Sequence, residues 1–178
     1  MLKIVAACLL VLLCHQGNSL HTNNKPTPSL SVTLAITGNG APAVCIRADT
    51  SDYYFVTATV FNNEDTTVAL FINSCSWPME AFVVQNDSIR FEFCFSGCDH
   101  NVPEKISVPG KKSAQFYGTI KSWKKDPAIA RIKLGFKHFR TVNDLWFSDE
   151  SSRNKRQYTM YWSNEVELKD NLYSYEIK

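Results

Sequence analysis

Apolar and polar residues alternate with a period of two along most of this chain, and this feature restricts the possible folds more than any other. In the segment 30–36, Leu30, Val32 and Leu34 alternate with small side chains. Successive side chains of a strand point to opposite faces, so this alternation is typical of strands with one buried face. We find no segment with the convincing spacing of an amphipathic helix. The pattern therefore predicts an all-β protein.

Further segments repeat the pattern between turns rich in asparagine, aspartate, proline and glycine. The segment 53–61 and the segment 67–72 are joined by a polar turn at 62–65, and we expect them to form a hairpin. Only 140–156 lacks the pattern, and a short helical turn is expected there around Val142 to Phe147. The strands predicted in this way are 30–36, 44–46, 53–61, 67–72, 81–84, 89–95, 106–108, 115–123, 129–139 and 157–168, with a short edge strand at 173–177.

Short strands separated by turns indicate a sandwich or a barrel. Up-and-down barrels usually have more regular spacing, so we expect an immunoglobulin-like antiparallel β-sandwich. With 44% hydrophobic and 20% charged residues, the chain has the composition of a folded globular protein. His138 continues the inward face that Leu134 and Phe136 begin. We expect this histidine to pack at the end of its strand.

The N-terminus has the features of a secretory signal peptide. Lys3 gives it a positive start, the segment 4–13 is an unbroken apolar run, and Gly17 to Ser19 places small residues where signal peptidase favours them. A membrane-spanning helix needs about 20 apolar residues, which this run does not reach. We predict cleavage after Ser19 and no transmembrane segment.

This interpretation divides the chain into a signal peptide at 1–19, an extended leader at 20–29 and a single immunoglobulin-like domain at 30–178. The leader is polar and interrupted by two prolines, which favours an extended conformation. The remaining length is enough for one domain with its own core. We expect a secreted or periplasmic protein, and the alternative is a lipid anchor on Cys14.

The cysteines that follow the signal peptide are even in number, which in an exported chain favours disulfides over free thiols. Their three possible pairings stay open. An alternative is a copper or zinc site, because thiolates beside an imidazole are ligands that these metals prefer. The disulfide candidates are Cys45, Cys75, Cys94 and Cys98, and the alternative metal ligands are Cys75, Cys94, Cys98 and His100.

The motifs that most directly indicate catalysis are absent from the sequence. It has no Gly-x-Ser-x-Gly nucleophile elbow, no phosphate-binding glycine loop and no His-Glu-x-x-His zinc motif. A nucleophilic cysteine needs a base beside it, and the histidines available after the leader are His100 and His138. We therefore predict that the protein is not an enzyme and uses no cofactor.

Charge is distributed unevenly along the chain. Residues 22–100 carry 3 basic and 8 acidic side chains, whereas residues 101–178 carry 15 basic and 9 acidic ones. Lysines gather around Trp123, and such a mixture of aromatic and basic residues can bind a polysaccharide, an anionic surface or nucleic acid. Export argues against nucleic acid. This asymmetry predicts one basic surface on the folded molecule.

Tryptophan in a turn or loop exposes a large apolar surface unless it packs or binds a partner. Packing over the end of the domain and contact with a partner are both compatible with the sequence. The expected function is that of an exported, non-catalytic binding or structural module with an unknown protein or polysaccharide partner. The residues selected as possible partner contacts are Trp77, Trp123, Lys124, Lys125, Trp146 and Phe147.

One stretch of the chain is similar to a known family. Between Tyr54 and Trp123, a strand ends in an asparagine turn at 60–63, a new strand begins at 66–68, and a Pro-Gly turn at 109–110 precedes another strand. In these elements the chain resembles bacterial immunoglobulin-like modules such as the intracellular proteinase inhibitor-like family. The resemblance implies a seven-stranded sandwich and a protein-binding role. The cysteines and the export signal are not part of that family's pattern.

Overall fold

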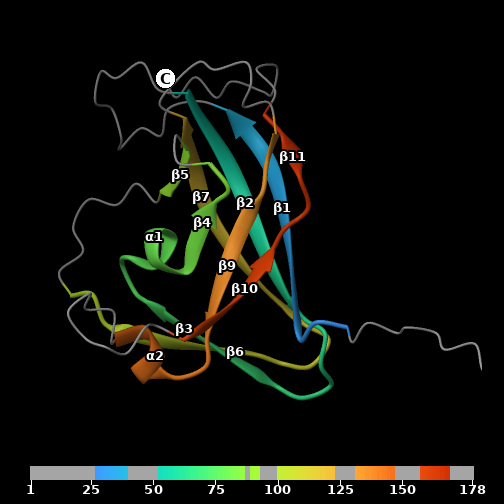
Figure 1. Cartoon of the computed structure of the whole chain (residues 1–178), viewed down its shortest axis with the longest axis vertical. Helices are drawn as coiled ribbons and strands as arrows, with labels where there is room; N and C mark the ends of the chain where they lie inside the picture. Colours follow the sequence, from blue (N-terminus) through green and yellow to red (C-terminus); the bar gives the residue numbers. More distant parts are fainter. Residues whose placement is uncertain are drawn as a thin grey trace, which may run out of the picture.

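Antiparallel strands and two short helices make up the computed structural model of the chain, which describes residues 27–39, 52–86, 89–92, 100–122, 131–146 and 157–168 (Figure 1). The prediction of an all-β protein is confirmed. The helices are α1 (Trp77–Ala81) and α2 (Val142–Trp146). The strands are β1 (Leu30–Asn39), β2 (Asp52–Asn62), β3 (Val68–Asn73), β4 (Phe82–Val84), β5 (Ile89–Glu92), β6 (Pro103–Val108), β7 (Ser113–Ser122), β8 (Arg131–Ile132), β9 (Leu134–Phe139), β10 (Tyr158–Trp162) and β11 (Val166–Glu167).

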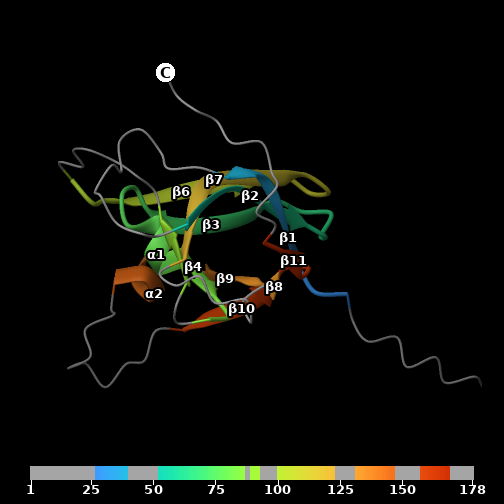
Figure 2. The same ribbon diagram turned by 90° about the horizontal axis from the view of Figure 1, so that it is seen from above.

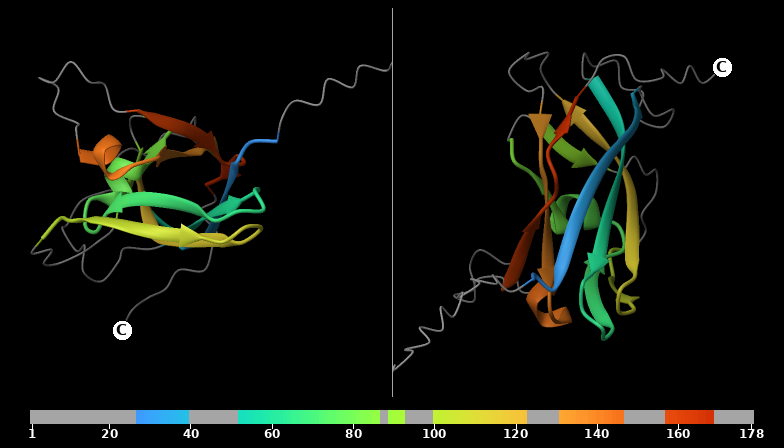
Figure 3. Two further views of the ribbon diagram at one scale, coloured as in Figure 1. Left: turned by 90° about the horizontal axis from the view of Figure 1, so that it is seen from below. Right: turned by 90° about the vertical axis from the view of Figure 1, so that its right-hand side faces the viewer.

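Two sheets form the body of the molecule. One contains four strands in the order β1-β2-β7-β5, and the other contains three in the order β10-β9-β4. Seen from above or below, these sheets are two layers that face each other (Figures 2 and 3). The pairs β3–β6 and β8–β11 form two further antiparallel ribbons. The predicted signal peptide at 1–19 and the predicted strands 44–46 and 173–177 lie outside the described residues.

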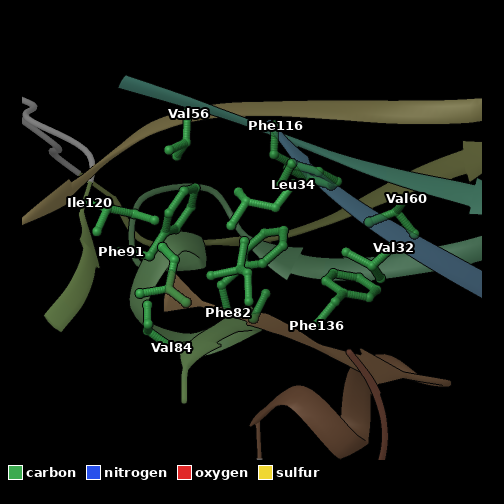
Figure 4. Close-up of a cluster of buried hydrophobic side chains, with 14 of the residues drawn as sticks. Val32, Leu34, Val56, Val60, Phe82, Val84, Phe91, Phe116, Ile120 and Phe136 are labelled. Carbon is green, nitrogen blue, oxygen red and sulfur yellow. The ribbon is translucent and has the colours of Figure 1, made fainter. Parts of the chain in front are cut away.

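The core lies between the two layers and is built by the predicted alternation. Leu30, Val32 and Leu34 of β1 are buried, while Thr33 between them is exposed. Aromatic rings join the layers, with Phe82 of β4 5.3 Å from Phe116 of β7 between ring centroids (Figure 4). Burial of such side chains stabilises a domain by about 1.5–3 kcal/mol each. The inward-facing residues predicted for β1 and β9 are therefore confirmed.

The predicted hairpin of 53–61 with 67–72 is wrong. Both edges of β2 are occupied, by β1 on one side and β7 on the other. After Asn62 the chain leaves this sheet, and β3 pairs with β6 instead. The turn between the two strands therefore changes sheet, although its composition resembles that of a hairpin turn.

A buried asparagine explains this change of sheet. Nδ2 of Asn62 donates hydrogen bonds to the carbonyl oxygens of Thr66, Val108 and Pro109 at 2.8, 3.0 and 3.2 Å. Its Oδ1 accepts a hydrogen bond from the backbone N–H of Glu64 at 2.9 Å. The side chain thus holds its own turn against the turn that follows β6. Unsatisfied buried polar groups are costly, so this network favours one geometry.

The turns at 62–66 and 109–112, which we call the paired turns, also touch through their backbones. The N–H of Lys111 donates to the carbonyl oxygen of Glu64 at 3.1 Å. Gly110 lies so close that a Cβ atom there would be 2.1 Å from the backbone oxygen of Asp65. A residue without a side chain is therefore required at position 110. The asparagine turn and the Pro-Gly turn of the sequence meet at this point.

The two helices differ in how well the sequence indicates them. Helix α2 confirms the predicted helical turn, and it begins after Thr141, whose Oγ1 accepts a hydrogen bond from the Asp144 N–H at 3.2 Å. Helix α1 was not predicted. It has Pro78 in its first turn, a position where proline is well tolerated. Its last residue, Ala81, is the first residue of the strand predicted at 81–84, which in the structure begins at Phe82.

The two longest predicted strands near the C-terminus are each divided. Segment 129–139 forms β8 and β9, and segment 157–168 forms β10 and β11. The chain around the break after β10 runs beside the outer edge of β1 (Figure 3, right), and this brings Asn164 to Leu34. There its Oδ1 accepts from the Leu34 N–H at 2.8 Å and its Nδ2 donates to the Leu34 carbonyl at 3.1 Å. An amide side chain thus takes the place of a neighbouring strand.

The last residues of the predicted leader are bonded to the domain. The carbonyl oxygen of Ser29 accepts from the Asn63 N–H at 2.9 Å, and its hydroxyl lies 2.7 Å from that of Tyr161. In the part of the chain that the structure describes, no helix combines the length and the apolar character needed to cross a membrane.

Candidate functional site

The outer surface of the sheet β10-β9-β4 carries exposed and half-buried large side chains around a buried glycine. We call this set of residues the aromatic face: Val83, Gly135, Lys137, Tyr158, Met160 and Trp162. This surface faces the viewer in Figure 1. Trp162 is 46% exposed and Tyr158 is 44% exposed. Register places Trp162, Gly135 and Val83 in one row across the three strands, and Met160 opposite Lys137 in the next. Exposed apolar groups of this kind often mark interaction sites.

Gly135 leaves space on the sheet for the side chains around it. A Cβ atom at this position would lie 2.8 Å from Sδ of Met160, 3.0 Å from Cγ1 of Val83 and 3.1 Å from the Trp162 ring. These side chains therefore close over the backbone of β9, where any larger residue would displace them. Because the glycine is buried while Trp162 stays exposed, the indole lies against the sheet with part of its surface open to solvent.

Tyr158, at the other end of β10, is held by two neighbours. The Phe139 ring meets it edge-on with centroids 5.8 Å apart, and Nζ of Lys137 lies 5.6 Å from its ring centroid. A lysine at this distance stabilises the ring's position by about 0.5–1 kcal/mol at an exposed site. These two contacts fix the position of the Tyr158 ring on the surface.

A polar pocket continues the aromatic face beyond Tyr158. Its volume is about 350 Å³. Asp144 is positioned by Thr141, whose N–H and hydroxyl both donate to Oδ2 at 3.0 and 2.9 Å. The lining combines a guanidinium, a carboxylate, an amide and two hydroxyls, supplied by Arg140, Asp144, Gln157, Tyr158 and Thr159.

A second cavity of about 400 Å³ opens between β4 and β5, the adjacent edges of the two sheets. Phe82 and Phe91, which line it, also belong to the core. Met79 at its rim is exposed. This cavity is mainly an opening onto the core between the two sheet edges, and it has fewer polar groups than the pocket beside Tyr158.

The outer face of the other sheet differs in character. Tyr117 of β7 is 61% exposed, and its hydroxyl donates to Oε1 of Gln115 at 2.6 Å. Its neighbours across the strands are small and uncharged, including Thr57 and Ala35. Tyr117 is therefore an exposed aromatic residue without the surrounding apolar group that Trp162 has.

The partner contacts selected from the sequence do not form one surface among the described residues. Trp77 packs against Phe82, Phe91 and Phe116, with ring centroids 5.3 to 5.8 Å apart, so packing accounts for this tryptophan. Trp146 ends α2. The side chain of Trp146, together with Trp123, Lys124, Lys125 and Phe147, lies outside the described residues.

The cysteine cluster is described only at Cys75 and His100. Sγ of Cys75 lies 3.4 Å from the carbonyl oxygen of His100, so these residues meet through the backbone. Cys75 is disulfide-bonded, and the other disulfide candidates, Cys45, Cys94 and Cys98, lie outside the described residues. No group of three or more metal-ligating side chains gathers within the described part of the chain.

His138 packs at the inner side of β9, as expected. Its Nε2 lies 3.0 Å from the carbonyl oxygen of Ala69 on β3. Burial lowers the pKa of this histidine below its ordinary value of 6.5; the Ala69 carbonyl opposes that shift, and the positive charge of Arg140 adds to it. A neutral ring with its Nε2–H donated to Ala69 is the form that this environment favours.

The aromatic face was not predicted from the sequence, because only tryptophans in turns and loops were considered as possible partner contacts. A signal was nevertheless present in β10, where Tyr158, Met160 and Trp162 are separated by Thr159 and Tyr161. Large side chains on both faces of one strand cannot all reach the same core. One of the two faces must therefore stay exposed or bind a partner.

Comparison with known proteins gives little further information. No protein-family model matches the chain, and no curated protein matches its sequence. Among solved structures, the FixG-related protein from Vibrio parahaemolyticus is similar with a TM-score of 0.38 and 8% identity, over 80% of this chain and 99% of that chain. Likeness at this level assigns neither a fold family nor a function.

Proposed function

We propose that this chain is an exported, non-catalytic binding module with an immunoglobulin-like β-sandwich fold, and that it holds its partner on the aromatic face. The observation that carries the proposal is the exposure of Trp162 and Tyr158 on one strand face, with Met160 between them. Tryptophan and tyrosine are the residues that most often dominate binding energy at interfaces. A protein that only needed to fold has no use for them there.

Export is supported by the signal-like N-terminus and by the disulfide at Cys75. Disulfides persist mainly in oxidising compartments outside the cytoplasm. A non-catalytic role is supported by His138, which is buried and occupied by Ala69 and is therefore unsuited to act as a base. Two facing antiparallel layers support the sandwich.

Site-specific photocrosslinking in the native host tests the binding role. A diazirine-bearing amino acid replaces Met160 in the aromatic face, and in a matched control it replaces Thr33 on the outer face of the other sheet. Diazirines insert into any neighbouring C–H or O–H bond, so protein and glycan partners are both captured. We expect an adduct at position 160 and none at 33. Equal labelling at both positions, or none at 160, contradicts the proposal.

The alternative function, copper or zinc binding by Cys75, Cys94, Cys98 and His100, makes a different prediction. A disulfide sulfur has no thiolate to offer a metal. We expect that none of the four cysteines after the signal peptide alkylates in the denatured, unreduced protein. Free thiols together with a metal in the native mass spectrum would support the metal site instead.

A further inference from the structure

We propose that the aromatic face and the adjoining pocket together bind a linear glycan whose sugars carry carboxylate groups. This inference rests on the proposed binding role and adds the class of partner. The rings of Trp162 and Tyr158 supply the stacking surfaces, and Arg140 in the pocket receives a carboxylate. The argument depends on the shape, the polar groups and the charge of the surface.

The aromatic face is small. The five residues from Tyr158 to Trp162 are four steps of a strand and span about 14 Å, and three strands are about 14 Å wide, which gives an area on the order of 200 Å². A stable protein complex buries about 800 Å² on each partner. The aromatic face is too small for a typical protein interface, but it suits a chain ligand that runs along β10 into the pocket.

The polar groups of the pocket are available for a ligand. In the part of the chain that the structure describes, the side chains of Arg140, Gln157 and Thr159 have no hydrogen-bond or ion-pair partner. A guanidinium, an amide and a hydroxyl in one pocket match the hydroxyl and carboxyl groups of a sugar. The pocket volume of about 350 Å³ lies in the range found for small-molecule sites.

The charge of the surface favours an acidic sugar over a neutral one. Arg140 brings a positive charge into the pocket, whereas the carboxylate of Asp144 is already engaged, because its Oδ2 accepts two hydrogen bonds from Thr141. A guanidinium binds a carboxylate through two parallel hydrogen bonds, which adds both energy and orientation. Neutral sugars would use the rings but leave Arg140 without a partner.

Titration with defined oligosaccharides tests the inference. The mature chain, residues 20–178, is titrated by tryptophan fluorescence and calorimetry with hexamers of galacturonate, mannuronate and guluronate, and with cellohexaose and mannohexaose as neutral counterparts. We expect at least one acidic hexamer to bind about tenfold more tightly than the neutral ones, which corresponds to about 1.4 kcal/mol. Raising the salt concentration is expected to weaken this binding.

Variants locate the site. Trp162→Ala and Arg140→Gln are each expected to weaken binding of the acidic hexamer about tenfold or more, and Tyr158→Ala gives a second test of the platform if Trp162→Ala fails to fold. Tyr117→Ala, an exposed aromatic on the opposite sheet, is the matched control and is expected to bind normally. A preference for acidic sugars that survives Arg140→Gln would overturn the assignment.

The two proposals fail in different ways. If the crosslink at position 160 forms with a protein and no acidic hexamer binds, the aromatic face is a binding site and the glycan inference is wrong. If neither the crosslink nor any hexamer is observed, both are wrong. Equal binding of acidic and neutral hexamers overturns the role of Arg140 and of charge.

Discussion

Asn62 shows how one buried side chain connects distant parts of the chain. It is fully buried, yet its side-chain amide donates to three carbonyl oxygens, one of them on Val108, 46 positions along the chain. Neither an apolar residue nor an aspartate reproduces this set, since the first has no donor and the second has only acceptors. The residue thus specifies where the chain changes sheet, at a position that sequence reasoning could recognise only as a turn.

Replacing Asn62 with alanine is expected to destabilise the protein by about 3 kcal/mol, because several buried carbonyl groups lose their donor. Urea denaturation measures the free energy of unfolding. Asn63→Ala is the control, since this half-buried amide donates to the Pro28 carbonyl at 2.8 Å and accepts a long hydrogen bond from the Ser31 hydroxyl at 3.5 Å, and their loss is expected to cost less than about 1 kcal/mol. Equal losses for the two variants would show that Asn62 is not the key residue of the turn.

His138 is expected to make stability depend on pH. Its folded pKa lies below the ordinary 6.5, so the unfolded chain takes up a proton first as the pH falls. The stabilisation from the neutral ring is complete above about pH 6.5 and is lost as the pH falls below 6.5 towards the folded pKa.

The variant His138→Gln keeps a donor for the Ala69 carbonyl but does not titrate. Unfolding of both proteins by urea at pH 7.5 and pH 5.0 isolates the histidine, because the other ionisable groups are shared. We expect the wild type to lose more stability than the variant between these two values. Parallel losses would mean that the histidine is not responsible.

At the scale of elements, alternation identified the strands but not their partners. The positions of β1, β2 and β7 follow from the sequence because each buries one face against the core. Pairing depends on which edges are free once the sheet is assembled, and β2 has none left for β3. Helix α1 was not predicted because it spans only Trp77–Ala81 and is too short to show a helical period.

Gly110→Ala tests the contact between the paired turns. The added Cβ would fall 2.1 Å from a backbone oxygen of Asp65, so one of the two turns must move. We expect the melting temperature to fall by about 8 °C or more, corresponding to at least 2 kcal/mol. Lys111→Ala removes the exposed 3.3 Å ion pair with Asp65 and the hydrogen bond from Nζ to the Asn63 carbonyl oxygen but adds no clash, so it is expected to lower the melting temperature much less. Similar effects of the two changes would contradict a steric role for the glycine.

For the molecule as a whole, the candidate site was harder to predict than the fold. Trp77 packs against the core, whereas Trp162 is partly open to solvent. Which of them is exposed depends on how the two layers cover each other and on the small size of Gly135 beneath Trp162. Neither condition can be read from the residues around each tryptophan.

An open sheet has edges, and Asn164 protects one of them. Asn164→Ala exposes the N–H and C=O of Leu34 on β1, and we expect the variant to self-associate at concentrations where the wild type is monodisperse. Light scattering over a concentration series measures this, with Asn143→Ala in exposed α2 as the control. A variant that scatters no more than the control would show that the edge needs no protection.

The contact of Asn164 with Leu34 also has a consequence for solubility during folding. A strand edge that is completed by one side chain needs no further strand, so the chain avoids the long exposed edges that lead neighbouring molecules to join into fibrils. The same two hydrogen bonds form only after residues 130 positions apart have come together. Until that moment β1 is open to other copies, and crowded conditions would favour aggregation over folding for any variant that delays the contact.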